Sequence, residues 1–151
     1  MKRLLLLLSL VALTACSGNL ADSECLALDE TRTKLWLRSR QAAEEAGSIE
    51  NPTRVARNEP CRPLMEKSKY DEWDACTLEK AQAAKVLTTK AELSELAGKD
   101  YVDDLVITTT AAQRKVDEAR SWLKKGNEAS ARMEKATVCS EAPAQTPDQR
   151  R

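Results

Sequence analysis

The most regular hydrophobic pattern lies in the C-terminal third of the chain. Uncharged residues recur there at alternating spacings of three and four, which is the 3.5-residue repeat of a coiled-coil seam. The repeat predicts one long helix from about Asp100 to Val138. Two local features favour a shorter helix: residues 101–110 are rich in β-branched side chains and could form a strand, and Gly126-Asn127 could end the helix early. The seam positions are Val102, Leu105, Thr109, Ala112, Val116, Ala119, Leu123, Gly126, Ser130, Met133 and Thr137.

Two more helices are predicted upstream of this seam. The first covers residues 23–46 and ends before Gly47, a residue type that commonly terminates helices. A connector at 48–60 follows, because it contains two prolines in turn-forming contexts. The second helix covers residues 63–97 and ends before Gly98.

The composition supports a helical protein with a thin core. Ala, Leu, Glu, Lys, Arg and Gln are abundant, and no proline occurs between Pro63 and Pro143. Large apolar residues are few, so close-packed helices would bury little area per turn. The expected fold class is all-α: a long antiparallel helical hairpin or three-helix bundle with coiled-coil-like packing, stapled by disulfides, over residues 23–139. The tail at 140–151 is expected to be disordered.

The N-terminus has the organisation of an export signal. Two basic residues precede an apolar run from Leu4 to Leu13, which is too short to cross a bilayer as a permanent helix. The tetrapeptide Leu13-Thr14-Ala15-Cys16 resembles the lipobox of bacterial lipoproteins. The resemblance implies that residues 1–15 are a cleaved signal peptide and that Cys16 carries the lipid. The alternative is an ordinary secretory signal that happens to precede a cysteine.

Membership of the lipoprotein class would also imply a location. More than one acyl chain on the mature N-terminus gives stable membrane attachment. Ser17 follows the lipobox, in place of the Asp that commonly retains such proteins in the inner membrane. The resemblance therefore implies an outer-membrane anchor facing the periplasm, with residues 16–22 as a short tether.

Four cysteines remain after lipidation, and an even number in an exported chain predicts two disulfides. Their wide spacing does not suit a zinc site. If the second and third helices form a hairpin that turns at 98–100, Cys61 and Cys139 lie opposite each other, which leaves Cys25 and Cys76 to pair. A bond between Cys61 and Cys76 would require a break in the second helix, since fifteen helical residues span about 22 Å.

Charge and residue content exclude several classes of function. The 24 basic and 24 acidic residues balance, so the chain has no net field that would attract nucleic acid. It contains no His, which rules out a Ser-His-Asp triad, a Cys-His dyad and a His-containing metal site. No phosphate-binding loop or other catalytic motif is present. We therefore expect no cofactor, no metal and no enzymatic activity.

The remaining candidate residues are aromatic. Trp36 and Trp122 each lie one position away from a helical seam, so each is either a half-buried flank of the core or an exposed anchor for a partner. The leading hypothesis is a lipid-anchored, non-catalytic protein that binds or scaffolds another envelope component. A protein of this kind is similar in size, anchor and helix content to pilotins, which escort secretin subunits. The alternative is a phage- or plasmid-derived lysis or entry-exclusion lipoprotein, or a periplasmic spacer rod that self-associates through the third helix.

Overall fold

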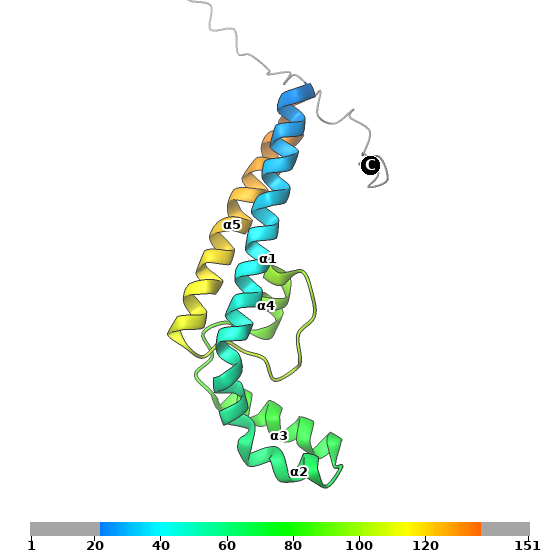
Figure 1. Cartoon of the computed structure of the whole chain (residues 1–151), viewed down its shortest axis with the longest axis vertical. Helices are drawn as coiled ribbons and strands as arrows, with labels where there is room; N and C mark the ends of the chain where they lie inside the picture. Colours follow the sequence, from blue (N-terminus) through cyan, green and yellow to red (C-terminus); the bar gives the residue numbers. More distant parts are fainter. Residues whose placement is uncertain (1–21, 137–151) are drawn as a thin grey trace, which may run out of the picture.

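The computed structural model describes residues 22–136, and this part of the chain is all-α, as predicted (Figure 1). It contains five α-helices and one 3-10 helix, and no β-strand occurs within residues 22–136. The elements are α1 (Asp22–Asn58), η1 (Glu59–Cys61), α2 (Arg62–Glu66), α3 (Tyr70–Ala83), α4 (Lys90–Ala97) and α5 (Thr110–Lys135).

The main packing unit is an antiparallel pair formed by α1 and α5 (Figure 1). Glu50 of α1 contacts Thr109 at the start of α5, Glu45 pairs with Lys115, and Trp36 contacts Asn127. Residues nearer the N-terminus of α1 thus contact residues nearer the C-terminus of α5, so the two helices are antiparallel. The pairing predicted from sequence, between the second and third helices, is therefore wrong: the first and last helices form the pair.

Small side chains fill the contact between α1 and α5. Alanines 42, 43 and 46 of α1 are buried against alanines 112 and 119 and Val116 of α5. Because Ala projects little beyond the backbone, the two helices can approach closely. The larger buried side chains come from α4 and from the segment before α5, and they are Leu93, Leu96, Leu105 and Ile107.

Helix α1 is longer than the sequence indicated. It continues through Gly47 and Pro52 to Asn58, so both the predicted end at Ala46 and the connector at 48–60 are wrong. A Cβ at Gly47 would make only ordinary contacts with Tyr101 and Leu105, at 3.6 and 3.7 Å, so no close approach requires glycine at this position. Proline removes one helical hydrogen bond, and the segment around it remains helical because it buries polar side chains that bind the rest of the fold, described below.

The predicted second helix is divided into three. The chain reverses at residues 67–69, where Ser68 adopts a positive φ of 57°, and it leaves helical geometry again between α3 and α4. The predicted end at Ala97 is confirmed: Gly98 caps α4 with φ of 64°, in the left-handed region that glycine favours.

The third predicted helix begins ten residues late. Residues 101–109 are non-helical, and Ile107 pairs with Thr88 in an isolated antiparallel bridge. The β-branched run is therefore not helical, in agreement with the alternative of a shorter helix. It forms a single bridge, however, and not the strand that this alternative included. Thr109 caps α5 by accepting a hydrogen bond from the Ala112 N–H at 3.3 Å. The helix then passes through Gly126 without interruption.

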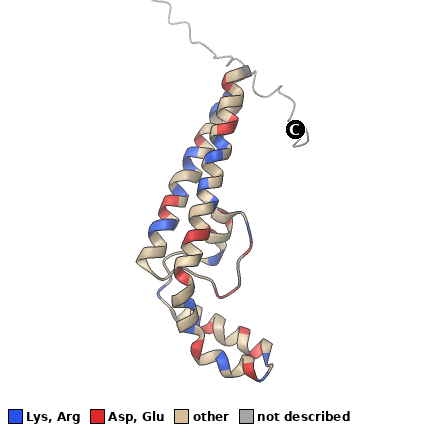
Figure 2. Cartoon of the chain, in the orientation of Figure 1, with Lys and Arg blue, Asp and Glu red and all other residues tan. Residues whose placement is uncertain are grey.

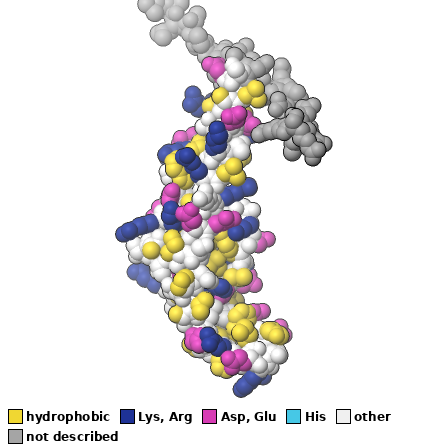
Figure 3. Space-filling model, viewed as in Figure 1, with side chains coloured by type: hydrophobic (Ala, Val, Ile, Leu, Met, Phe, Trp, Pro, Cys, Tyr) yellow, Lys and Arg dark blue, Asp and Glu magenta, His cyan; other side chains and the backbone are white. Residues whose placement is uncertain are grey.

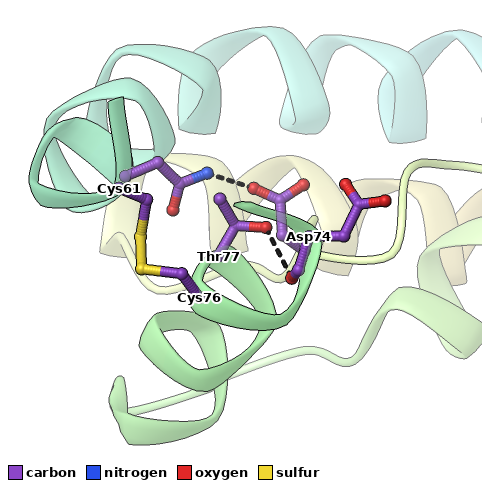
Figure 4. The surroundings of a disulfide bond; sticks show 6 residues. Cys61, Asp74, Cys76 and Thr77 are labelled. Atoms are coloured by element: carbon purple, nitrogen blue, oxygen red, sulfur yellow. Dashed lines mark hydrogen bonds between the residues drawn. A yellow bond between two sulfur atoms is a disulfide. The ribbon is translucent and has the colours of Figure 1, made fainter. Parts of the chain in front are cut away.

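The disulfide arrangement differs from both predicted pairs. Cys61 is bonded to Cys76, with their Cα atoms 5.9 Å apart, because the reversal after α2 brings α3 back beside η1 (Figure 4). The predicted bonds Cys61–Cys139 and Cys25–Cys76 are therefore wrong. Cys25 is also disulfide-bonded, and its partner lies outside the described residues.

Several predictions concern residues outside 22–136. They are the signal peptide at 1–15, the lipidated Cys16 and its tether, Cys139, and the tail at 140–151. Within the described range, no helix combines the length and apolar character needed to cross a bilayer.

The α1–α5 contact predicts opposite effects for two glycine substitutions. A Cβ at Gly126 would lie 2.6 Å from Nε1 of Trp36, whereas a Cβ at Gly47 would lie 3.6 Å from Cε1 of Tyr101, an ordinary contact. We expect Gly126→Ala to lower the free energy of unfolding by about 1–3 kcal/mol through overpacking. Gly47→Ala should raise it by up to about 1 kcal/mol through helix propensity. Urea denaturation followed by circular dichroism measures both, and equal effects would contradict the observed packing.

The helix register also predicts the second disulfide. Trp36 lies opposite residues 126 and 127 of α5. Cys25 precedes Trp36 by eleven residues, so in a continuous antiparallel pair it would lie opposite about residue 138. Non-reducing peptide mapping should therefore recover Cys25 linked to Cys139, alongside Cys61 linked to Cys76. Recovery of Cys25 linked to Cys16 would contradict the register and would leave the lipobox cysteine without a free thiol.

Candidate functional site

A small helical lobe lies at the end of the molecule opposite the N-terminus of α1 (Figure 1). We call residues 59–83, which comprise η1, α2 and α3, the distal lobe. Its fold depends on the turn at Ser68, where Ser68 and Lys69 N–H groups donate to the carbonyl oxygens of Met65 and Leu64, both at 2.9 Å. The turn makes α2 and α3 antiparallel neighbours, so the lobe is a short helical hairpin.

The interior of the distal lobe is small. Cys61 is fully buried, and α3 contributes Thr77 and Ala81, while α2 contributes no buried residue. The Thr77 hydroxyl donates back to the Asp74 carbonyl oxygen at 3.0 Å (Figure 4). Leu64 and Trp73 are half-buried. Few side chains are therefore fully buried within the lobe, and the disulfide is its one covalent connection between η1 and α3.

Apolar side chains of the distal lobe face outward instead. Tyr70 is 60% exposed, Met65 45% and Leu78 40%. Figure 3 shows hydrophobic side chains gathered at this end of the molecule, among charged ones. We call these three residues the lobe patch. The patch could not be predicted from the sequence interpreted as one helix over residues 63–97, because the turn between Met65 and Tyr70 is absent from such a helix.

A buried aspartate holds the end of α1 that carries the lobe. The Asp104 carboxylate accepts hydrogen bonds from Arg54 Nη1 at 3.3 Å and from Asn58 Nδ2. Its carbonyl oxygen accepts from Arg57 Nη2 at 2.9 Å. These contacts tie the last two turns of α1 to the segment before α5, so they fix the direction in which the chain enters the distal lobe.

Glu50 makes a second buried connection, to the start of α5. Its side chain is fully buried and accepts hydrogen bonds from the Thr108 and Thr109 N–H groups, at 3.1 and 3.0 Å, and from both threonine hydroxyls. Arg57 Nη1 lies 3.8 Å away. Burial raises the pKa of Glu50, but the threonine hydrogen bonds outweigh it, so the pKa lies below its usual value. The carboxylate also lies at the positive end of the α5 dipole.

Both tryptophans proposed as partner anchors are half-buried between the long helices. Trp36 lies against the backbone of Gly126 and donates from Nε1 to Asn127 Oδ1 at 3.2 Å. Trp122 lies under the guanidinium of Arg38, 5.1 Å from the ring centroid, and beside the amine of Lys125 at 4.5 Å. These contacts place each ring in the α1–α5 packing, with part of its surface still exposed.

Two grooves of the described range are wide and open to solvent. One groove lies between α4 and α5, where Arg120 pairs with Glu92 at 2.5 Å. Another lies between α1 and the segment after α4, where Lys99 pairs with Glu44 at 2.9 Å, a hydrogen bond that raises the pKa of the lysine. Figure 2 shows acidic and basic residues interspersed along the helices. Residues 22–136 contain no group of three or more acidic, cysteine or histidine side chains that could hold a metal ion.

Comparison with known proteins returned no relative: no family model, no curated protein and no solved structure matches the chain.

The Glu50 contacts predict a pH-dependent contribution to stability. The pKa of Glu50 is lower in the folded chain than in the unfolded chain, so its contribution is present above the unfolded value of about 4.3 and is lost as pH falls through the folded value. Glu50→Gln replaces one accepting oxygen by a donor and should lower the free energy of unfolding by about 2 kcal/mol at pH 7. Its stability should also fall less steeply between pH 5 and 3 than that of the wild type.

Glu45→Gln is the matched control for this measurement. Glu45 is paired at the surface with Lys115, at 2.8 Å, and surface ion pairs contribute little. Urea denaturation at several pH values compares both variants with the wild type. Equal stabilities of the two variants at pH 7 would show that the Glu50 contacts do not hold α5 to α1.

Proposed function

We propose that the chain is a bacterial lipoprotein anchored in the outer membrane, facing the periplasm, and that it presents the distal lobe to another envelope protein. In this proposal it is a non-catalytic binding or scaffolding component with a pilotin-like or secretion-accessory role. The α1–α5 pair acts as a coiled-coil-like rod, and α4 extends the middle of the rod into a three-helix bundle.

The lipid anchor is supported by the distribution of cysteines. The chain has five, and Cys61 and Cys76 are bonded to each other. Cys25 is also bonded, and the helix register favours Cys139 as its partner. This arrangement leaves one cysteine, Cys16, which is the residue that the lipobox resemblance selects for acylation.

The observation that carries the proposal is the length and position of α1. The helix begins six residues after Cys16 and continues for 37 residues, which corresponds to about 55 Å. A chain acylated at Cys16 would therefore hold the start of α1 near the bilayer and the distal lobe far from it. Exposed apolar side chains at such a distance are available to a protein but not to the lipid surface.

The alternative, a spacer rod, makes a different use of the same length. A spacer needs the long helices but not an exposed lobe patch at their end. The two functions are distinguished by whether the lobe patch contacts a specific protein in the envelope.

Site-specific crosslinking tests the proposal in intact cells. A photoreactive phenylalanine analogue replaces Tyr70 in the lobe patch, and the control replaces Leu37, which is 57% exposed on α1. We expect one discrete crosslinked product from position 70 and none of that mass from position 37. Cys16→Ser should abolish membrane attachment and the product together.

Three other outcomes would contradict this proposal. Equal products from both positions would indicate non-specific contact, and no product from either position would favour the spacer rod. A Cys16→Ser chain that remained attached to the membrane would exclude the lipid anchor.

A further inference from the structure

We propose that the Cys61–Cys76 disulfide is a redox-controlled clamp, which determines whether the distal lobe is folded and so whether the lobe patch exists. The inference rests on the proposed function for its biological meaning, because the lobe patch is the surface proposed to bind a partner. Its physical basis is the difference between the interior of the lobe and that of the rest of the molecule.

Without the disulfide, the lobe has little to keep it folded. Helix α2 has five residues and α3 has fourteen, and isolated helices of such length are marginal in water. Apart from Cys61 itself, the fully buried side chains of the lobe are Thr77 and Ala81, while Leu64 and Trp73 are half-buried and α3 also contacts α1. A crosslink closing a loop of about fifteen residues shifts the ratio of folded to unfolded chain by on the order of a hundredfold. The crosslink is therefore a large contribution to the stability of a lobe that has few fully buried side chains.

The body of the molecule has its own core. Leu93, Leu96, Leu105, Ile107 and Val116 are buried among the alanines of α1 and α5. The contacts of Glu50 and Asp104 also lie outside the lobe and hold α1 to the segment before α5. Opening the clamp should therefore unfold the lobe and leave the body intact.

The lobe patch lies on the part of the chain that the clamp closes. Met65 and Tyr70 fall inside the loop between the two cysteines, and Leu78 lies two residues beyond it. Their separation in space is set by the turn at Ser68 and by the antiparallel placement of α2 and α3. Loss of the clamp would disperse these three side chains, so the patch is present in the oxidised state.

The bond can be opened from one side. Cys61 is fully buried, whereas Cys76 is partly exposed. A thiolate of a dithiol reductant attacks Cys76 Sγ, and Cys61 Sγ leaves as a thiolate that takes up a proton. The second thiol of the reductant then attacks the mixed disulfide, which releases the Cys76 thiol and the oxidised reductant. Two electrons and two protons pass from the dithiol to the two cysteines.

Hydrogen exchange of the full chain tests the clamp directly. The chain is treated with dithiothreitol at neutral pH without denaturant, and free thiols are then alkylated and located by mass spectrometry. We expect Cys61 and Cys76 to become alkylated, and amide protection within 62–83 to fall at least tenfold. Protection within 90–97 and 110–135 should not change. The double variant Cys61→Ser, Cys76→Ser should reproduce this pattern without any reductant.

Two results would overturn the clamp. One is a lobe that keeps its protection in the double variant, which would show that the helices hold themselves. The other is a bond that dithiothreitol opens only after denaturant unfolds the whole chain, which would make it a permanent structural crosslink.

The crosslink from position 70 separates this inference from the proposed function. In cells, the product seen with the oxidised lobe should be lost when Cys61 and Cys76 are both replaced by Ser. If no product forms with the wild-type cysteines, the proposed partner role fails, while the hydrogen exchange result still decides whether the clamp exists.

Discussion

The buried carboxylate of Glu50 connects α1 to the start of α5. Without these contacts α5 could begin at a different residue, because the first N–H groups of a helix have no helical partners. Glu50 accepts hydrogen bonds from the Thr108 and Thr109 N–H groups and from both hydroxyls, so it fixes where α5 starts and on which side of α1. The alanine seam depends on that register, since a shift of one residue would turn Ala112 and Val116 away from α1.

The small residues of the seam explain why so many polar contacts are buried around it. Alanine allows close helix packing but contributes little apolar area, so specificity has to come from other interactions. Trp36 provides one, because its ring is accommodated only where α5 has Gly126. Asp104 provides another at the opposite end of α1, through Arg54 and Asn58. The α1–α5 pair is therefore held in register by a few specific contacts, because its alanine seam buries little apolar area per turn.

The sequence predicted the helical class and the end of α4 at Gly98, because these depend on local chemistry. It failed where distant contacts override local signals. Pro52 and Gly47 have the character of a helix end, yet α1 continues through both, and Glu50 and Arg54 of that segment bind Thr109 and Asp104. Of the candidate site, Cys61 and Cys76 were identified as disulfide cysteines but not as a pair. The reversal at Ser68 carries no proline or glycine to indicate it.

The two regions of the molecule are stabilised by different means, and this difference has a functional consequence. The body relies on many contacts between α1, α4 and α5, none of which involves the distal lobe. The lobe has one covalent crosslink and few fully buried side chains, and Met65, Tyr70 and Leu78 on it are exposed. A protein that only spanned a distance would gain nothing from an exposed apolar end, because such a surface favours aggregation unless a partner covers it. In the proposed function, the packed helices of the body are the stable support, and the distal lobe is the surface that a partner covers.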